Sequence, residues 1–246
     1  MRRLVLVLTI AFLLGAVAAP TARAAPPPDA GDLAADCNAD GILSVTGTVR
    51  FRGGTGTLTA DCVVTMAPGS TLVLHRIDLD STCCFFVVGD AQERTTVRVV
   101  GSTVDLAGPV QLAPGCCAGT GEPGRSEADG TAIVRNSTIR GQTVEVSGSI
   151  ADGGGRVDVR GSLLEATDPT FGSVSVLASL SGGTGGRVVV RDSTLIAVSE
   201  TRIATGASGH TVARDDVFSG PATVTVTTGP GGSCSSVANT PPVPCT

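Results

Sequence analysis

One six-residue motif occurs five times in this 246-residue chain, and it limits the possible folds more than any other feature. Each copy begins with an apolar residue and continues with a position that is Arg in four copies. Gly, Asn or Asp follows, and then a polar, a variable and an apolar residue. Repeats of this kind predict stacked coils, each of which contributes only part of a shared core. The copies are residues 99–104, 134–139, 159–164, 190–195 and 213–218.

The third position of the motif contains only residue types that tolerate a left-handed backbone at low cost, so every coil should bend there. Equivalent residues are 23 to 35 positions apart, which suits a coil of two or three short strands. We therefore predict an all-β fold, a right-handed parallel β-helix of about six coils that stack about 4.8 Å apart. A β-sandwich is the alternative, but it gives no reason for one motif to recur. The bend residues are Gly101, Asn136, Gly161, Asp192 and Asp215.

Alternation of apolar and polar residues predicts further short strands, within residues 143–146, 173–176 and 223–226. Earlier strands are expected within residues 43–58 and 70–80. Because the open edges of the end coils must be covered, we expect a helical turn within residues 32–38 to cap the first coil and prolines near the C-terminus to protect the last. The predicted organisation is a signal peptide over 1–24, a linker and cap over 25–40, a β-helix domain over 41–230 and a disulfide-closed tail over 231–246.

The first 24 residues have the pattern of a secretory signal peptide. Arg2 and Arg3 form the basic start, residues 4–19 the apolar stretch, and residues 22–24 a cleavage signal. That stretch is short for a membrane span, and nothing downstream is long or apolar enough to cross a bilayer. We therefore expect an exported protein that is secreted, extracellular or held in the cell envelope, without a membrane span after signal cleavage.

The charge balance argues against nucleic acid or an anionic membrane as the partner of the molecule as a whole. Cleavage after residue 24 leaves 14 Arg against 22 acidic residues, a net charge of −8, and the chain contains no Lys. Trp and Tyr, which form flat platforms in many sugar-binding sites, are also absent.

All eight cysteines follow the predicted signal peptide, and an even number in an exported chain predicts disulfides. Eight cysteines allow about 105 pairings, among which Cys234 with Cys245 closes the shortest C-terminal loop. The doublets Cys83-Cys84 and Cys116-Cys117 should each place one sulfur on either face of a strand, so that adjacent doublets could bond to each other twice. A zinc site is the alternative, but zinc ligands are usually further apart and His partners are missing. The other cysteines expected in disulfides are Cys37 and Cys62.

Arginine occupies the second position of every motif copy except the first, which has Val100. If the coils stack, these guanidinium groups form a ladder along one face. Such a ladder could bind an acidic polysaccharide or another cell-surface polyanion through paired hydrogen bonds. The alternative is a solvated row neutralised by nearby acids, because stacked like charges are unfavourable. The ladder consists of Arg135, Arg160, Arg191 and Arg214, and the acids that could neutralise it are Asp158, Glu165, Asp192, Asp215 and Asp216.

Residues 36–41 match the start of a calcium loop of the kind found in EF-hand and dockerin modules. Asp36, Asn38 and Asp40 would supply oxygen ligands at alternate positions, and a glycine follows for the sharp turn. The closing bidentate acid is missing, because Gly47 stands at the twelfth position. An ordinary Asp/Asn/Gly turn explains the same residues, so calcium is the only cofactor considered and none is required.

Asp215 and Asp216, with His210 upstream, are the only candidate catalytic group in the sequence. Paired carboxylates can act as general acid and base when their environments separate their pKa values. Both acids, however, occupy the same motif columns as Gly161 and Ser162, so turn formation already explains them. We therefore assign no catalytic residue and lean towards a protein that is not an enzyme.

The glycine-led segments 154–163 and 185–194 resemble the repeats of filamentous-haemagglutinin-type secreted β-helices. This resemblance covers residues 95–228 and implies a surface or adhesive solenoid. The chain also resembles the pectin lyase-like superfold, which implies polysaccharide lyase or glycoside hydrolase activity as the alternative. We therefore expect an exported structural or adhesive β-helix protein that binds an acidic polymer along its arginine ladder.

Overall fold

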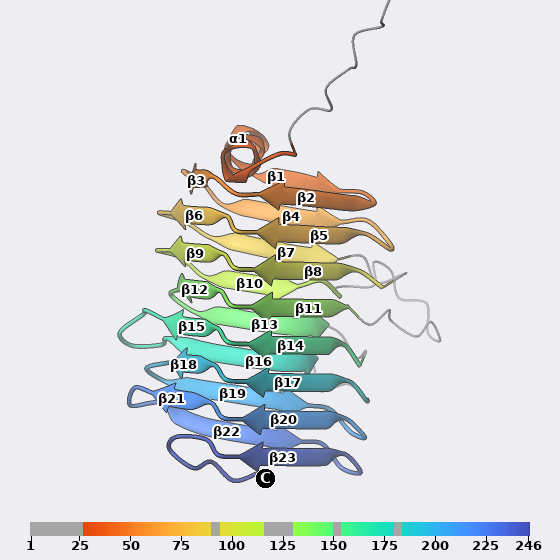
Figure 1. The fold of residues 1–246 in the computed structure, drawn as a ribbon, viewed down its shortest axis with the longest axis vertical. Coiled ribbons are helices and arrows are strands. Elements are labelled where there is room, and N and C mark those ends of the chain that lie inside the picture. Colours follow the sequence, from red (N-terminus) through yellow and green to blue (C-terminus); the bar gives the residue numbers. More distant parts are fainter. Residues whose placement is uncertain (1–26, 90–93, 116–129, 150–153, 180–183) are drawn as a thin grey trace, which may run out of the picture.

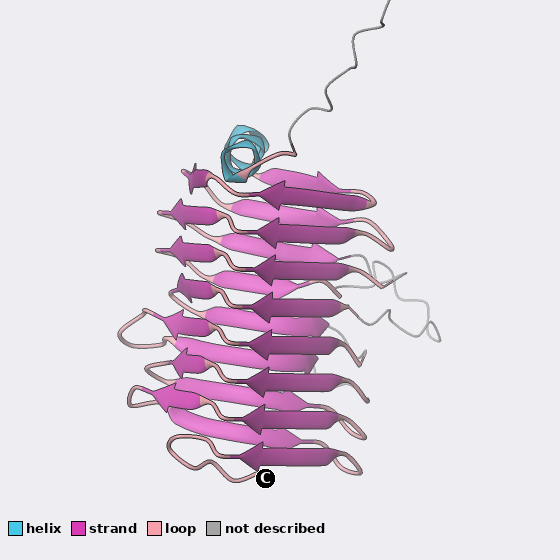
Figure 2. Ribbon diagram, viewed as in Figure 1, coloured by secondary structure: helices cyan, strands magenta, loops and turns pink. Residues whose placement is uncertain are grey.

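The computed structural model describes residues 27–89, 94–115, 130–149, 154–179 and 184–246. The chain winds into a parallel β-solenoid of about seven turns, with α1 (Ala30–Asp40) at one end and the C-terminus at the other (Figures 1 and 2). Neighbouring strands of every sheet in these ranges run parallel, which confirms the predicted fold class. A β-sandwich is excluded, because its sheets would be antiparallel. The predicted signal peptide, 1–24, lies outside the described residues.

Three parallel sheets, A, B and C, form the walls of the solenoid, and the chain visits them in that order. Sheet A contains β1 (Ile42–Val45), β4 (Cys62–Met66), β7 (Phe85–Gly89), β10 (Val110–Ala113), β13 (Val144–Ser149), β16 (Ser173–Ser179), β19 (Glu200–Thr205) and β22 (Thr223–Thr228). Sheet B contains β2 (Thr48–Arg52), β5 (Thr71–His75), β8 (Thr96–Val100), β11 (Thr131–Arg135), β14 (Arg156–Arg160), β17 (Arg187–Arg191), β20 (His210–Arg214) and β23 (Ser233–Val237). Sheet C contains β3 (Thr55–Leu58), β6 (Asp78–Ser81), β9 (Thr103–Leu106), β12 (Thr138–Gly141), β15 (Leu163–Ala166), β18 (Thr194–Ile196) and β21 (Val217–Ser219).

The five motif copies stack in register at the corner between sheets B and C. Arg160 pairs with Arg191 across β14 and β17, and the backbone N–H of Gly161 donates to the Arg191 carbonyl oxygen over 3.1 Å. All five predicted bend residues have a positive φ, between 49° and 60°. The predicted stacking of the motif is therefore confirmed.

The same corner recurs in three places that the motif does not identify. Gly53, Arg76 and Ala238 follow β2, β5 and β23 and have φ values of 71°, 54° and 58°. After Arg76 the apolar Ile77 replaces the polar fourth residue of the motif, so the pattern is lost although the bend is kept. The solenoid consequently has about seven turns rather than the six that we predicted.

Columns of equivalent apolar side chains fill the interior. Val134, Val159 and Val190 of sheet B are fully buried, and Leu164 and Leu195 of sheet C are fully buried beside them. Complete burial of such a side chain contributes roughly 1.5–3 kcal/mol. Like residues stack because the parallel register places equivalent positions of successive turns directly over one another.

A column of buried polar side chains continues through the corner. Each member accepts a hydrogen bond from the backbone N–H of the equivalent residue in the preceding turn, over 3.0–3.4 Å. These bonds satisfy backbone donors that the bend removes from the sheet ladders. The column consists of Ser102, Ser137, Ser162, Ser193, Asp216 and Asn239.

The helix α1 covers the first coil and is longer than the single turn that we expected. The side-chain carboxylate of Asp29 caps its N-terminus by accepting hydrogen bonds from the N–H groups of Gly31 and Asp32. Leu33 and Cys37 are buried and face the solenoid. At the other end β23 pairs with β20, so the solenoid continues into the segment 231–246. No helix in the described ranges is long and apolar enough to cross a membrane.

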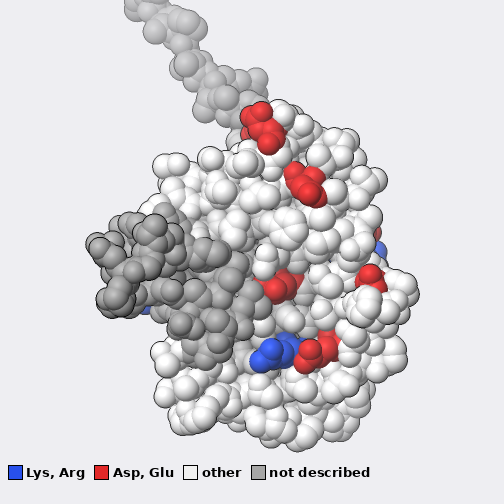
Figure 3. Space-filling view, turned by 180° about the vertical axis from the view of Figure 1, so that it is seen from behind, with Lys and Arg blue, Asp and Glu red and all other residues white. Residues whose placement is uncertain are grey.

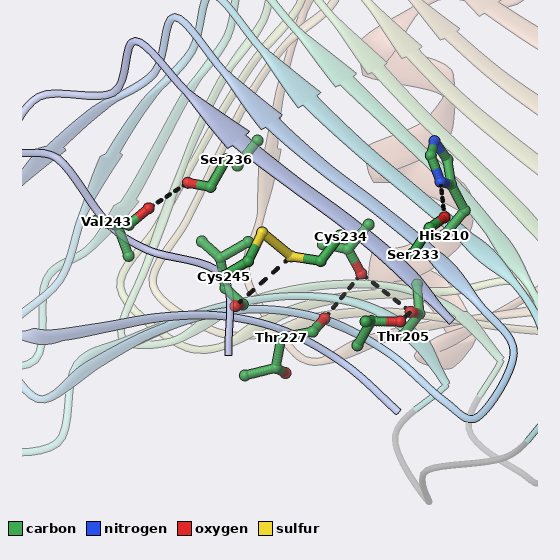
Figure 4. Close-up of a disulfide and its surroundings, with 12 residues drawn as sticks. Thr205, His210, Thr227, Ser233, Cys234, Ser236, Val243 and Cys245 are labelled. Carbon is green, nitrogen blue, oxygen red and sulfur yellow. Dashed lines mark hydrogen bonds between the residues drawn. A yellow bond between two sulfur atoms is a disulfide. The ribbon is translucent and has the colours of Figure 1, made fainter. Parts of the chain in front are cut away.

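Two disulfides close the ends of the solenoid. Cys37 of α1 bonds to Cys62 of β4, and Cys234 of β23 bonds to Cys245, as Figure 4 shows for the second pair. Cys83 and Cys84 form no disulfide, and both lie in the bend before β7 rather than in a strand. The expectation that this doublet points to opposite faces and bonds to a second doublet was therefore wrong for its described half. Cys116 and Cys117 lie outside the described residues.

Candidate functional site

The outer face of sheet B, which faces the viewer in Figure 1, carries most of the basic side chains of the chain. Strand alternation points the first, third and fifth residues of each five-residue strand outward. These positions contain nine arginines and two histidines but a single carboxylate, that of Asp158. The cationic residues are Arg50, Arg52, His75, Arg98, Arg135, Arg156, Arg160, Arg187, Arg191, His210 and Arg214, and we call them the cationic face.

The predicted arginine ladder is one edge of this face. Arg135, Arg160, Arg191 and Arg214 pair in consecutive register at the ends of β11, β14, β17 and β20. The structure therefore brings together all four residues of the prediction.

A second basic column, which the sequence analysis missed, runs along the opposite edge of the same strands. Arg156 pairs with Arg187, and Arg187 pairs with His210. These residues begin their strands, outside the repeated motif. The signal that could have identified them is their position four residues before the ladder arginines, which places both on the same face of a strand.

Asp158 lies between the two columns and neutralises part of the ladder. Its carboxylate accepts hydrogen bonds from Arg135 Nη2 at 2.5 Å and from Arg160 Nε at 2.6 Å. Burial alone would raise the pKa of Asp158, but the hydrogen bonds and charges of the two guanidinium groups outweigh it and lower that pKa. Asp158 is therefore ionised at neutral pH and supports the alternative interpretation, an internal ion network, at this part of the ladder.

Arg191 is different, because it forms no ion pair in the described part of the chain. Its Nε atom is buried and has no hydrogen-bond partner. Among the described residues, Arg214, the next residue of the ladder, forms an ion pair with its exposed neighbour Asp215, over 3.0 Å. In the C-terminal half of the ladder, Arg191 thus keeps a guanidinium group without an ion-pair partner among the described residues, and its terminal Nη donors are the ones that a ligand could use.

An apolar strip separates the two basic columns in the C-terminal half of the face. Val189 and Val212 point outward between the columns, yet they are only 3% and 7% exposed. Long arginine side chains can bury their stems over such residues while the guanidinium groups remain in water. This half of the cationic face therefore has apolar side chains along its centre and basic side chains along both edges.

A hollow of about 450 Å³ marks the N-terminal end of the face, over β2, β5 and β8. Arg50, Arg52, Arg98 and His75 line it together with apolar side chains. None of these arginines forms an ion pair with another described residue. The hollow therefore has the shape and charge to receive an anionic group.

The other walls of the solenoid have a different charge. Outward positions of sheet C carry Asp78, Asp80, Asp105 and Glu165. Arg140 on the same sheet forms ion pairs with Asp105 and Glu165. Figure 3 shows the side opposite that of Figure 1, where one small basic patch lies among acidic and uncharged residues of the described chain and a little more basic surface is visible at the edges. Basic charge is thus concentrated on one wall of a molecule that is acidic overall.

Comparisons with known proteins do not assign this solenoid to a family. No family model, no curated protein and no solved structure matches the chain. The chemistry of the site therefore has to be inferred from its own residues.

The candidate catalytic residues do not converge. Asp216 is buried in the polar column of the corner, where it accepts hydrogen bonds from the backbone N–H groups of Ser193 and Arg214. Asp215 is exposed and pairs with Arg214. His210 begins the strand that Arg214 ends, and its Nδ1 lies 2.5 Å from Ser233 Oγ (Figure 4). The strand spans roughly 13 Å from His210 to Arg214 at 3.3 Å per residue, and the two acids follow it at the opposite end from the histidine.

Asp216 nevertheless has an unusual ionisation. Burial raises the pKa of Asp216 to about 7, although the hydrogen bonds that its carboxylate accepts from two backbone N–H groups act to lower it. The neighbouring carboxylates Asp192 and Asp215 raise it further. The placement of Asp216 in the column explains this shift as a consequence of packing.

The candidate calcium ligands lie in the helix rather than in a loop. Asp36, Asn38 and Asp40 belong to α1, where alternate residues point in different directions. The Asn38 side chain donates to the carbonyl oxygen of Thr57 and accepts from the N–H of Thr59. Gly41 ends the helix in a left-handed conformation, with φ 69°. These residues therefore act as helix cap and helix-to-strand contact, and they do not have the geometry of a calcium loop.

Proposed function

We propose that this protein is an exported β-solenoid that binds an acidic polymer along the cationic face of sheet B. One observation carries the proposal: nine outward arginines share a wall with a single outward carboxylate, in a chain with more acids than bases. A row of unneutralised guanidinium groups is unfavourable unless anions come from elsewhere. A bound polyanion would supply them.

The dimensions of the face favour a polymer over a small ligand. Eight strands about 4.8 Å apart span roughly 34 Å from one end of the sheet to the other. Basic residues recur on the successive strands β14, β17 and β20, and the hollow lined by Arg50, Arg52 and Arg98 adds a deeper anion site at the other end. A chain of regularly spaced carboxylates or sulfates could engage several of these groups at once, so that weak contacts add up.

An acidic polysaccharide suits the composition of the face better than a nucleic acid does. Guanidinium groups form paired hydrogen bonds with carboxylates and sulfates. The outward positions of sheet B contain no Phe, Tyr or Trp side chain on which bases could stack. The acidic wall of sheet C would also repel a long, highly charged duplex that reached beyond the cationic face. Export to the cell exterior, as the N-terminal sequence predicts, would place the protein where such polymers occur.

The test is retention on immobilised polygalacturonate, with uncharged dextran as the reference matrix. We expect the wild-type protein to bind the acidic matrix and to elute as the salt concentration rises. Arg187→Ala combined with Arg191→Ala should weaken binding by about tenfold, because each removes a partly exposed ion pair with the polymer worth up to about 1 kcal/mol. The matched control combines Arg140→Ala with Arg202→Ala, which changes the net charge equally on sheets C and A.

Equal losses in both double variants would overturn the proposed site, since they would show that only net charge matters. Retention that is independent of salt would overturn the ionic mechanism. The same incubation should be assayed for new polymer ends. Their appearance would instead favour the alternative function, a carbohydrate-active enzyme.

A further inference from the structure

Three successive turns meet at the corner between sheets C and A and bring together residues that are remote in sequence. Asp61 lies between β3 and β4, Cys83 and Cys84 lie between β6 and β7, and Gly108 lies between β9 and β10. The N–H of Cys62 donates to the Cys84 carbonyl oxygen over 3.0 Å, and the N–H of Gly108 donates to that of Cys83 over 3.1 Å. Backbone hydrogen bonds on both sides therefore hold the cysteine doublet in place.

Both thiols of the doublet reach the same carboxylate. A carboxylate oxygen of Asp61 and the two Sγ atoms all lie within 4.8 Å of one another, and Cys83 Sγ donates a hydrogen bond to Asp61 Oδ1 over 2.6 Å. This convergence is possible because the cysteines occupy a bend. The bend is held by the Ser81 hydroxyl, which accepts from the N–H of Cys83 and donates to the Leu58 carbonyl.

The next turn leaves room for the sulfur atoms. Gly108 has no side chain, and a Cβ atom there would lie 2.8 Å from Cys84 Sγ and 2.7 Å from the Cys83 carbonyl oxygen. Both distances are shorter than van der Waals contact. Any other residue at this position would displace the doublet.

We propose that Cys83, Cys84 and Asp61 form a binding site for a thiophilic divalent cation of the zinc class. Two thiolate sulfurs and one carboxylate oxygen are ligands that such ions accept, and water can complete a tetrahedral set. On binding, each thiol loses its proton to solvent as a metal–sulfur bond forms, and no electron is transferred. The cation balances two of the three negative charges that then meet at the corner.

Asp61 and Cys84 shift each other's ionisation. Burial, followed by the hydrogen bond and charge of Asp61, raises the pKa of Cys84 to about 12. The same contacts lower the pKa of Asp61, most strongly through the hydrogen bond from Cys83. Cys84 is therefore held as a thiol beside this carboxylate until a cation offsets the negative charge.

Titration of the purified mature chain with Cd²⁺ tests the site, because thiolate-to-cadmium bonds absorb in the ultraviolet. We expect one equivalent to produce this absorption and about two protons to be released, measured by calorimetry in buffers of different ionisation enthalpy. Zn²⁺ should compete for the same site. Cys83→Ser with Cys84→Ser should abolish the absorption, and Asp61→Asn should weaken binding at least about tenfold.

Two control variants separate the site from other thiols and acids. Cys116→Ser with Cys117→Ser should leave the cadmium absorption unchanged, and so should Asp80→Asn on sheet C. Circular dichroism of each variant establishes that the solenoid remains folded. Retention on polygalacturonate is measured without Cd²⁺, because polyuronates bind this ion themselves. It should be the same for wild type and for Cys83→Ser with Cys84→Ser, so failure of the metal site can be distinguished from failure of the proposed polymer function.

Three outcomes would overturn the metal site. The first is a folded wild-type protein without cadmium absorption although its Cys83 and Cys84 can be alkylated. The second is absorption that survives in the Cys83→Ser, Cys84→Ser variant. The third is a mature protein in which mass spectrometry finds these two sulfurs already in a disulfide.

Discussion

Arg160 and Arg191 lie opposite each other on β14 and β17, but only Arg160 forms an ion pair among the described residues. The difference comes from the residue two positions earlier in each strand, which is Asp158 in β14 and Val189 in β17. Equivalent arginines of one ladder therefore have different roles. Arg160 belongs to a network that stabilises the fold, whereas Arg191 keeps its hydrogen-bonding capacity for a ligand.

We expect the two single variants to separate these roles. Arg191→Ala should weaken retention on polygalacturonate and leave the free energy of unfolding nearly unchanged. Arg160→Ala should lower that free energy by roughly 1–3 kcal/mol, because Asp158 is 2% exposed and would lose one of its two charged partners. Chemical denaturation and polymer retention, measured on both variants, test this. Equal stability losses would contradict the distinction.

The second prediction concerns the pH dependence of stability. The pKa of Asp216 is about 7 in the folded protein and ordinarily 3.8. Because the pKa of this carboxyl group is higher in the folded than in the unfolded protein, its ionisation destabilises the fold, and the full destabilisation is present above pH 7. The destabilisation decreases as the pH falls from 7 towards 3.8, because the folded protein then binds the proton more tightly. Stability should therefore increase between pH 8 and pH 5, by roughly 2–3 kcal/mol from this group at about 1.4 kcal/mol per unit.

The variant Asp216→Asn should lose this part of the pH dependence. Asparagine fits the column, because Asn239 occupies the same position in the next turn and donates to the carbonyl oxygen of Ala213. Unfolding by denaturant at pH 5 and pH 8 measures the effect, with Asp80→Asn as an exposed control. The prediction fails if wild type and Asp216→Asn respond equally to pH.

The third prediction tests the left-handed corner. Gly161 has φ 55°, and a Cβ atom there would lie 2.7 Å from Asn136 Oδ1. Gly161→Ala should lower the free energy of unfolding by roughly 1–2 kcal/mol through backbone strain alone, and crowding should add to this. Combining it with Asn136→Gly relieves the crowding but not the strain. Thermal unfolding of the single and double variants separates the two causes, and an unchanged melting temperature in Gly161→Ala would contradict both.

The fourth prediction concerns the cap of the first coil. The Cys37–Cys62 disulfide joins α1 to β4 across 25 positions, and both cysteines are buried. Cys37→Ala with Cys62→Ala should cost about 3–4 kcal/mol on the loop-entropy model. Because each coil contacts mainly its neighbours, hydrogen exchange should increase first in α1, β1 and β2 and least in β22 and β23. Uniform exchange along the solenoid would contradict this local role.

The sequence determined the corner of the solenoid and the stacking of its central coils. A left-handed bend selects Gly, Asn or Asp locally, and strand alternation is local too, so a motif containing Gly161 and Asp192 could be recognised without a structure. The turn at Arg76 was missed because tertiary packing imposes the same backbone on a residue that does not by itself favour it. Four arginines of the ladder were predictable for the same local reason.

Only the tertiary structure decided which other residues share a surface with that ladder. Arg156 and Arg187 join it through the register of sheet B, and the hollow at Arg50 requires three strands to be aligned. Asp61 meets Cys83 and Cys84 because two corners stack one turn apart, 22 positions along the chain. Contacts between successive coils depend on the length of each intervening loop, and the lengths of these loops vary along the chain. The register that joins distant residues is therefore settled by packing of the whole solenoid.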